Sequence, residues 1–107
     1  MSKRRVLAIS GALSLLAVLP AQAAGDASKG KEIFAAKCLE CHNIDSKEVK
    51  IGPGLKGVKD GKLPSGKAAT HDNVLDNINK GSDTMPSFKD ELKSQEKEDV
   101  IAYVLTL

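Results

Sequence analysis

Apolar residues recur at intervals of three and four positions in three stretches of the chain, which is the spacing of an amphipathic helix. These stretches are residues 27–38, residues 71–80 and the segment that follows Ser94. Residues 43–69 lack such a period and are rich in Gly and Pro, which predicts a long loop. No segment alternates polar and apolar residues convincingly, as a half-buried strand would. The pattern therefore predicts an all-α domain of three main helices and long loops.

Capping residues mark the ends of these helices. Asp26 and Ser94 are predicted N-caps, because a short polar side chain can accept a hydrogen bond from an unpaired N–H group of the first turn. Gly81 is suited to end the second helix. Gly30 lies inside the first helix, where a glycine costs roughly 1 kcal/mol relative to alanine. We therefore expect another element to approach the first helix closely at this glycine.

A different pattern occupies the N-terminus. A basic segment, Lys3–Arg5, precedes the apolar run Val6–Leu19 and the small-residue cleavage motif Ala21–Ala23. An apolar run of about 14 residues is too short to cross a bilayer, which takes roughly 20. Residues 1–23 are therefore predicted to be a cleaved secretory signal peptide, and residues 24–107 the mature domain. This predicts a periplasmic protein without stable membrane insertion.

Cleavage would also change the charge balance of the chain. The whole chain has 16 Lys or Arg and 14 Asp or Glu, whereas the predicted mature domain has 13 and 14. This balance gives no support for nucleic-acid binding. Residues 47–67 hold six lysines and two acids, and residues 90–99 hold five acids and two lysines. Two interpretations account for this asymmetry. The two segments are either solvated faces or the ends of a dipole that steers a charged redox partner.

The predicted mature domain has little bulk with which to build a core. The chain contains one Tyr, two Phe and no Trp. Domains of this size usually need a disulfide, a metal or a ligand to complete their core. With two cysteines only, the sequence indicates that a further group fills the interior.

The two cysteines and the histidine that follows them, Cys38, Cys41 and His42, admit several chemistries. A thioredoxin-like redox pair needs a βαβ setting that the predicted elements lack. A zinc site with His71 as fourth ligand would place adjacent Cys41 and His42 awkwardly in one tetrahedron. A Cys38–Cys41 disulfide would close too short a loop to stabilise much. The C-x-x-C-H pattern is the attachment signature of c-type haem, in which two thioethers hold the porphyrin and the histidine faces the iron.

A covalently bound haem would supply the missing core and would give the long loop something to wrap. It also predicts a second axial ligand. Met85 is the only methionine of the predicted mature domain, and it lies in a polar loop before Pro86, a poor place for a core filler. His71 would give bis-histidine ligation, but we interpret it as a surface residue at the start of a helix. We therefore predict His42 and Met85 as the iron ligands.

With these residues assigned, residues 25–107 resemble the small class I c-type cytochromes, most closely the short bacterial monohaem carriers of the cytochrome c6, c551 and c555 kind. The segments that match in order are Gly30 with Phe34, Cys38–His42, Ile51–Leu55, Met85–Phe88 and Asp99–Leu107. The resemblance implies one covalently bound haem c. It also implies that the Pro53 carbonyl accepts a hydrogen bond from His42 Nδ1–H, and that Tyr103 packs over Gly30 and Phe34.

The predicted function is that of a soluble periplasmic one-electron carrier, which is not an enzyme and acts as a monomer between donor and acceptor proteins. An iron with both axial positions filled has no open site for a substrate. One alternative is a haem enzyme or gas-ligand sensor with an open sixth position. Others are an electron-transfer subunit of a larger oxidoreductase and a haem-free thiol module.

Overall fold

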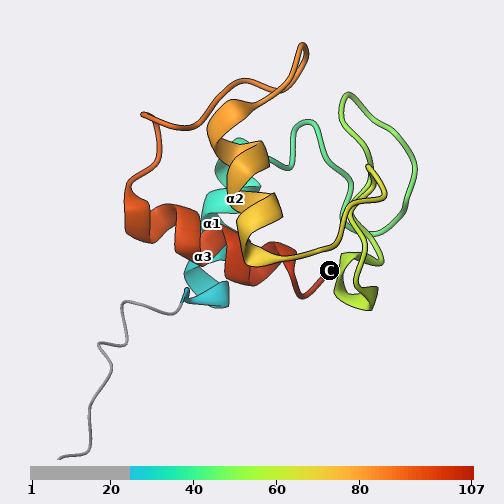
Figure 1. The fold of residues 1–107 in the computed structure, drawn as a ribbon, viewed down its shortest axis with the longest axis horizontal. Helices are drawn as coiled ribbons and strands as arrows, with labels where there is room; N and C mark the ends of the chain where they lie inside the picture. Colours follow the sequence, from blue (N-terminus) through green and yellow to red (C-terminus); the bar gives the residue numbers. More distant parts are fainter. Residues whose placement is uncertain (1–24) are drawn as a thin grey trace, which may run out of the picture.

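The computed structural model describes residues 25–107 and consists of helices joined by long loops (Figure 1). Its elements are α1 (Ala27–Lys37), the 3-10 turn η1 (Val58–Asp60), α2 (His71–Lys80) and α3 (Ser94–Val104). Within this range, strand-like pairing is limited to one isolated bridge between Lys62 and Ala68. The all-α fold is thus confirmed. The predicted signal peptide, residues 1–23, lies outside the described residues. None of the helices described is both long and apolar enough to span a bilayer.

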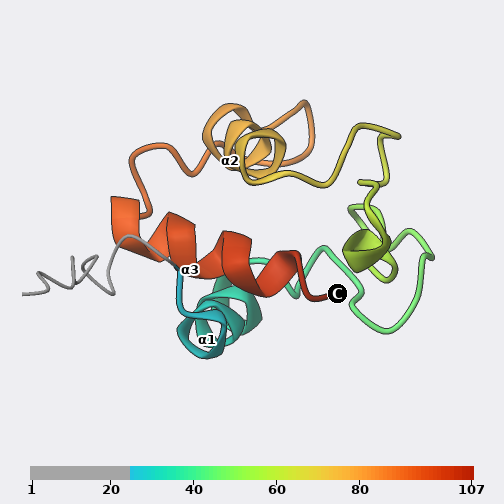
Figure 2. The ribbon, with the colours of Figure 1, turned by 60° about the horizontal axis from the view of Figure 1, so that its bottom comes forward.

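The helix α3 lies between the other two helices, and each of them packs against it (Figure 2). The long connection between α1 and α2 extends to one side and carries η1 near the end of the chain (Figure 1). There the N–H groups of Gly57 and Lys59 donate to the carbonyl oxygen of Leu107, over 3.2 and 3.0 Å. These bonds fasten the loop to the end of α3.

The contact between α1 and α3 is close because Gly30 has no side chain. A β-carbon at this position would overlap the carbonyl oxygen of Asp99 and would lie 3.0 Å from Cβ of Tyr103. Next to this crossing, the rings of Phe34 and Tyr103 pack edge to face, with centroids 5.4 Å apart and planes at 62°. The expected packing of Tyr103 over Gly30 and Phe34 is confirmed.

The helix ends follow the predicted signals with one exception. The side chain of Asp26 accepts the N–H group of Ser28 at 2.9 Å, as expected of an N-cap, and Gly81 ends α2 with a φ of +63°. The prediction that Ser94 caps α3 is wrong, because Ser94 is the first helical residue and Lys93 precedes it as the cap. The Glu96 carboxylate reaches back to accept the Lys93 N–H group at 2.9 Å, which satisfies this end without a polar cap side chain.

The core joins residues of all three helices to apolar residues of the loops. Its buried apolar members are Phe34, Val58, Leu63, Val74, Ile78, Phe88, Leu92, Val100, Ile101, Tyr103 and Val104. Four of these eleven come from the connections between the α-helices: Val58, Leu63, Phe88 and Leu92. The loops therefore form part of the core, and a cavity lies between them and the helices.

Candidate haem-binding site

A cavity of about 390 Å³ opens between α2, the C-terminal end of α1 and one side of α3. Its volume falls in the range of roughly 300–1,000 Å³ that is usual for ligand and cofactor sites. Apolar side chains from helices and loops form most of its wall: Phe34, Ile51, Leu55, Leu63, Val74, Ile78, Phe88, Val100 and Val104. The five predicted site residues also line it: Cys38, Cys41, His42, Pro53 and Met85. The fold thus brings together residues that are up to 47 positions apart in the chain.

The turn that follows α1 presents Cys38, Cys41 and His42 to this cavity. Cys38 is the C-cap of the helix. Its carbonyl oxygen accepts the N–H groups of Cys41 and His42, at 3.1 and 3.0 Å, so that the backbone folds back on itself directly after the helix. The two thiols and the imidazole are therefore held on one short, hydrogen-bonded turn.

The Cys38 thiol does not have the properties of a reactive nucleophile. The two thiols are not joined by a disulfide in the structure described. Burial, and secondarily the neighbouring Cys41, raises the pKa of the Cys38 thiol to about 11, which keeps it protonated at neutral pH. The zinc interpretation also lacks support, because residues 25–107 contain no group of three or more His, Cys, Asp or Glu side chains arranged to hold a metal ion.

The imidazole of His42 is fixed by the loop that contains Pro53. His42 Nδ1 lies 2.7 Å from the Pro53 carbonyl oxygen, which can only accept, so Nδ1 carries the proton and Nε2 is left with its lone pair. Within residues 25–107, no hydrogen bond engages Nε2. A carbonyl partner on one ring nitrogen is the usual outer-shell support of a histidine that binds a metal through the other.

Gly52 also supports the His42 ring. The sequence predicted only that Gly52 lies in a loop. Its N–H group donates to the Cys41 carbonyl at 2.8 Å. A β-carbon on Gly52 would lie 2.5 Å from Cε1 of His42. The loop therefore presses its backbone flat against the imidazole, and a side chain at this position would displace the ring. The Gly-Pro-Gly triplet at residues 52–54 was the available signal, but its contact partner is ten positions away in the chain.

Met85 enters the cavity from the loop that follows α2. The N–H group of Ser82 donates to the Met85 carbonyl at 2.9 Å, and the Met85 N–H group donates to Ser82 Oγ at 3.2 Å. Half-buried, Met85 packs against the core cluster. His71, the competing ligand, does not line the cavity and instead pairs with Glu98 at 2.6 Å.

The residues around the cavity fit a haem c. They combine an apolar wall, two thiols on one turn, an imidazole whose Nε2 lone pair is available, and a thioether from another segment. Imidazole and thioether are axial ligands of cytochrome iron, and thiols are the groups that form the two covalent links. Residues 25–107 contain no cysteine other than Cys38 and Cys41, and no methionine other than Met85.

Comparisons with known proteins agree with this chemistry. A family model described as "Cytochrome C oxidase, cbb3-type, subunit III" matches residues 25–104. Cytochrome c6 of Rippkaea orientalis is 34% identical over 86 residues, which cover 80% of this chain and 75% of that protein. The chain belongs to the c-type cytochromes. Another relative, cytochrome c6 of Thermosynechococcus vestitus, is 30% identical over 106 residues, with 98% of this chain and 92% of that protein covered.

The structural comparison places this c-type cytochrome in class I. The solved structure of cytochrome c6 from the diatom Phaeodactylum tricornutum matches it with a TM-score of 0.62 and 30% identity, over 77% of this chain and 93% of that one. The expected family and fold are therefore confirmed. As a class I c-type cytochrome, the protein carries one covalently bound haem c and functions in electron transport with redox partners.

Proposed function

We propose that this c-type cytochrome carries single electrons between two redox partner proteins in the periplasm. The haem c would be joined to Cys38 and Cys41 and ligated by His42 and Met85. The observation that carries the proposal is the convergence of these four side chains on one cavity, with His42 Nδ1 fixed at 2.7 Å from the Pro53 carbonyl. When bound, haem c supplies an iron that alternates between the ferric and ferrous states.

The residues around the cavity have separable roles in this proposal. The Pro53 carbonyl holds the His42 ring in one tautomer and orientation and makes it a stronger ligand. The Met85 thioether raises the potential of the iron relative to a second histidine. The apolar wall keeps water away from the site, so that a change of charge at the iron causes little rearrangement of its surroundings.

The distribution of ionisable groups supports a carrier rather than an enzyme. The titratable residues that line the cavity come from the last residue of α1 and the turn that follows it: Lys37, Cys38, Glu40, Cys41 and His42. The part of the wall near Met85 is built from apolar and neutral polar side chains. A peroxidase-like enzyme needs an acid or base next to an open iron position, on the side away from the proximal histidine.

Localisation and assembly belong to the same proposal. Residues 1–23 would direct export and would then be removed, which leaves the domain of residues 24–107 in the periplasm. The lysine-rich and acidic segments at residues 47–67 and 90–99 give the surface two charged regions with which a redox partner can be oriented. We expect the carrier to act as a monomer and to bind each partner transiently.

The ligand assignment is tested by comparing Met85→Ala with His71→Ala in protein produced with the cytochrome c maturation machinery. The wild type should show a haemochrome spectrum in pyridine, a mass increased by one haem, and the long-wavelength methionine–iron band when oxidised. Met85→Ala should lose this band, have a lower potential and bind small ligands, whereas His71→Ala should keep the band. The reverse result would exchange the two assignments, and a mass equal to that of the polypeptide alone would contradict covalent attachment.

A second candidate function is that of an electron-transfer subunit within a larger oxidoreductase. The description of the matching family model, which names a subunit of a cytochrome c oxidase, favours it. The two functions differ in the size of the native assembly. A tagged chain that fractionates as an isolated small protein supports the diffusible carrier, whereas constant stoichiometry with an oxidase through purification supports the subunit.

A further inference from the structure

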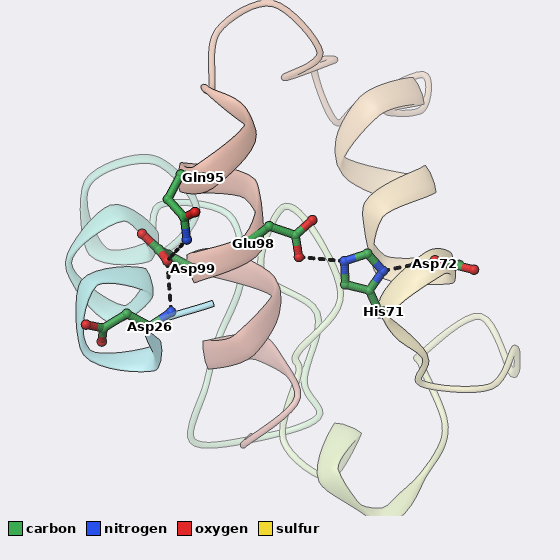
Figure 3. A network of polar contacts seen from close by, with 6 residues as sticks. All are labelled: Asp26, His71, Asp72, Gln95, Glu98 and Asp99. Carbon is green, nitrogen blue, oxygen red and sulfur yellow. Dashed lines mark hydrogen bonds and ion pairs between the residues drawn. The ribbon is translucent and has the colours of Figure 1, made fainter. Parts of the chain in front are cut away.

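His71 lies outside the haem cavity, at the first position of α2, and both nitrogens of its ring face carboxylates. Nε2 lies 2.6 Å from Oε2 of Glu98 in α3, and Nδ1 lies 2.9 Å from Oδ1 of Asp72 (Figure 3). A neutral imidazole has one N–H group and can donate to only one of these oxygens, whereas the imidazolium can donate to both. The geometry therefore fits the charged ring. Hydrogen bonds first to Asp72 and then to Glu98 raise the pKa of His71 above its ordinary value.

The His71–Glu98 ion pair is the only hydrogen bond or ion pair that joins α2 to α3 within residues 25–107. The charged groups that face the His71 ring are Asp72 from its own helix and Glu98 from α3. The other carboxylate of α2, that of Asp76, pairs with Lys80 at 2.9 Å along the same helix. The polar attachment of α2 to α3 thus depends on one titratable ring.

The position of α2 matters for the haem site because the turn that follows this helix carries Met85. Gly81 ends α2, and two hydrogen bonds between Ser82 and Met85 close the following turn. Val74 and Ile78 of the same helix line the cavity. A shift of α2 on α3 would therefore move the Met85 thioether relative to the part of the site that comes from α1.

We propose that His71 is a positioning residue, whose ion pair with Glu98 fixes α2 on α3 and thereby makes the hold of Met85 on the iron dependent on pH. This inference rests on the proposed ligation by Met85. The ion pair is complete while the ring is charged, and it is lost as the pH rises and the ring gives up its proton. The attachment of α2, and with it the Met85 ligation, is then expected to loosen toward alkaline pH.

The experiment compares the wild-type holoprotein with His71→Gln, and with Asp76→Asn as a control that removes a carboxylate of α2 without touching α3. Three quantities are followed from about pH 5 to about pH 9, the range in which a histidine titrates. They are the methionine–iron band, the NMR titration of the His71 ring, and the hydrogen-exchange rates of the α2 amides. In the wild type and in Asp76→Asn, the band should weaken and α2 exchange should accelerate with the midpoint of the His71 titration.

His71→Gln should show no such step. At the acidic end of the range, its α2 amides should exchange about two- to fivefold faster than those of the wild type, as expected for the loss of a partly exposed ion pair. Superimposable pH profiles of His71→Gln and the wild type would overturn the proposal. If the wild type lacks the band at every pH, the ligation by Met85 is wrong. In that case the hydrogen-exchange rates of the α2 amides test the role of His71 by themselves. A pH-dependent step in these rates that His71→Gln abolishes supports the positioning role, and the absence of a step overturns it.

Discussion

The two sides of α3 are attached to their neighbours in different ways. On the side of α1, Gly30 lets the backbones approach closely, and the rings of Phe34 and Tyr103 pack edge to face at 5.4 Å. On the side of α2, the haem cavity separates part of the two helices, and the polar link is the His71–Glu98 ion pair. The first interface depends on the size of side chains. The second depends on charge and on the group that fills the cavity.

Two consecutive residues of α3 show the same difference at the scale of single side chains (Figure 3). The Asp99 carboxylate, 4% exposed, accepts the N–H group of Asp26 at 2.8 Å and so holds the start of α1. The Glu98 carboxylate, 28% exposed, faces the His71 ring of α2. Burial strengthens an interaction with a charged group, whereas water screens an exposed one. The two carboxylates should therefore contribute unequally to stability.

The largest effect is expected from preventing haem attachment. An empty cavity of about 390 Å³ would lower the free energy of unfolding by at most about 9 kcal/mol, at roughly 24 cal/mol per Å³. This value is an upper bound because the mouth of the cavity admits water. This is comparable to the whole stability of a typical domain, about 5–15 kcal/mol. In the double variant Cys38→Ser, Cys41→Ser, we expect little folded holoprotein and α2 amides without protection from hydrogen exchange. The amides of α1 and α3 should keep more protection than those of α2.

Wild-type protein loaded with haem is the control for this experiment. Equal loss of protection in all three helices would show that the α1–α3 contact also depends on the filled cavity. The two sides of α3 would then not differ in this respect. Full protection of α2 without haem would show that the cavity contributes nothing to holding this helix.

The next largest effect is expected at the crossing of α1 and α3. Gly30→Val places a side chain where the carbonyl oxygen of Asp99 lies, so the helices must move apart. Overpacking of this kind costs about 3 kcal/mol, measured as the free energy of unfolding of the holoprotein in denaturant. Ala35→Val, at an exposed position of the same helix, is the matched control and should cost a few tenths of a kcal/mol. Equal losses for the two variants would contradict the close contact at Gly30.

The α1–α3 side was largely predictable from the sequence, because its signals are local. Asp26 caps α1, the apolar stripe of the helix holds Phe34, and the cost of a glycine at position 30 suggested a close neighbour. The turn with Cys38 and His42 follows directly from the motif. The error at Ser94 has a local cause as well, since a carboxylate three positions after Lys93 reached back to serve as the cap.

The α2–α3 side could not be predicted in the same way. His71 and Glu98 are 27 positions apart, and no periodicity relates them, so the sequence showed only a polar residue at a helix start. The contact between Gly52 and the His42 ring is hidden for the same reason. The convergence of Met85 and His42 on one cavity required the path of two long loops, which Gly and Pro allow but do not specify.

A smaller effect should separate the two neighbouring carboxylates of α3. Asp99→Ala removes the acceptor for the Asp26 N–H group and for the Gln95 amide at 3.1 Å, and should lower the free energy of unfolding by about 2 kcal/mol. Glu98→Ala removes a partly exposed ion pair and should cost about 0.5 kcal/mol at neutral pH. Denaturant unfolding of the two variants under one set of conditions gives both values. Equal costs would mean that burial does not distinguish the two sides of α3.

The smallest effect, and the one that separates the two interfaces most cleanly, is a dependence on pH. The folded protein binds the His71 proton more tightly than the unfolded chain does, because the pKa of His71 is raised above its ordinary value of 6.5. The stabilisation by the ring is therefore complete below about pH 6.5 and is lost as the pH rises through the raised pKa. The loss of unfolding free energy in His71→Gln should be about 0.5 kcal/mol at acidic pH and should vanish at alkaline pH.

Gly30→Val provides the contrast for this measurement, because the overlap that it creates involves a backbone carbonyl and no titratable group. Its loss of about 3 kcal/mol should stay the same at both pH values. A cost of His71→Gln that does not change with pH would mean that the ring contributes by packing and not by charge. The α2–α3 interface would then resemble the α1–α3 interface in kind and differ from it only in strength.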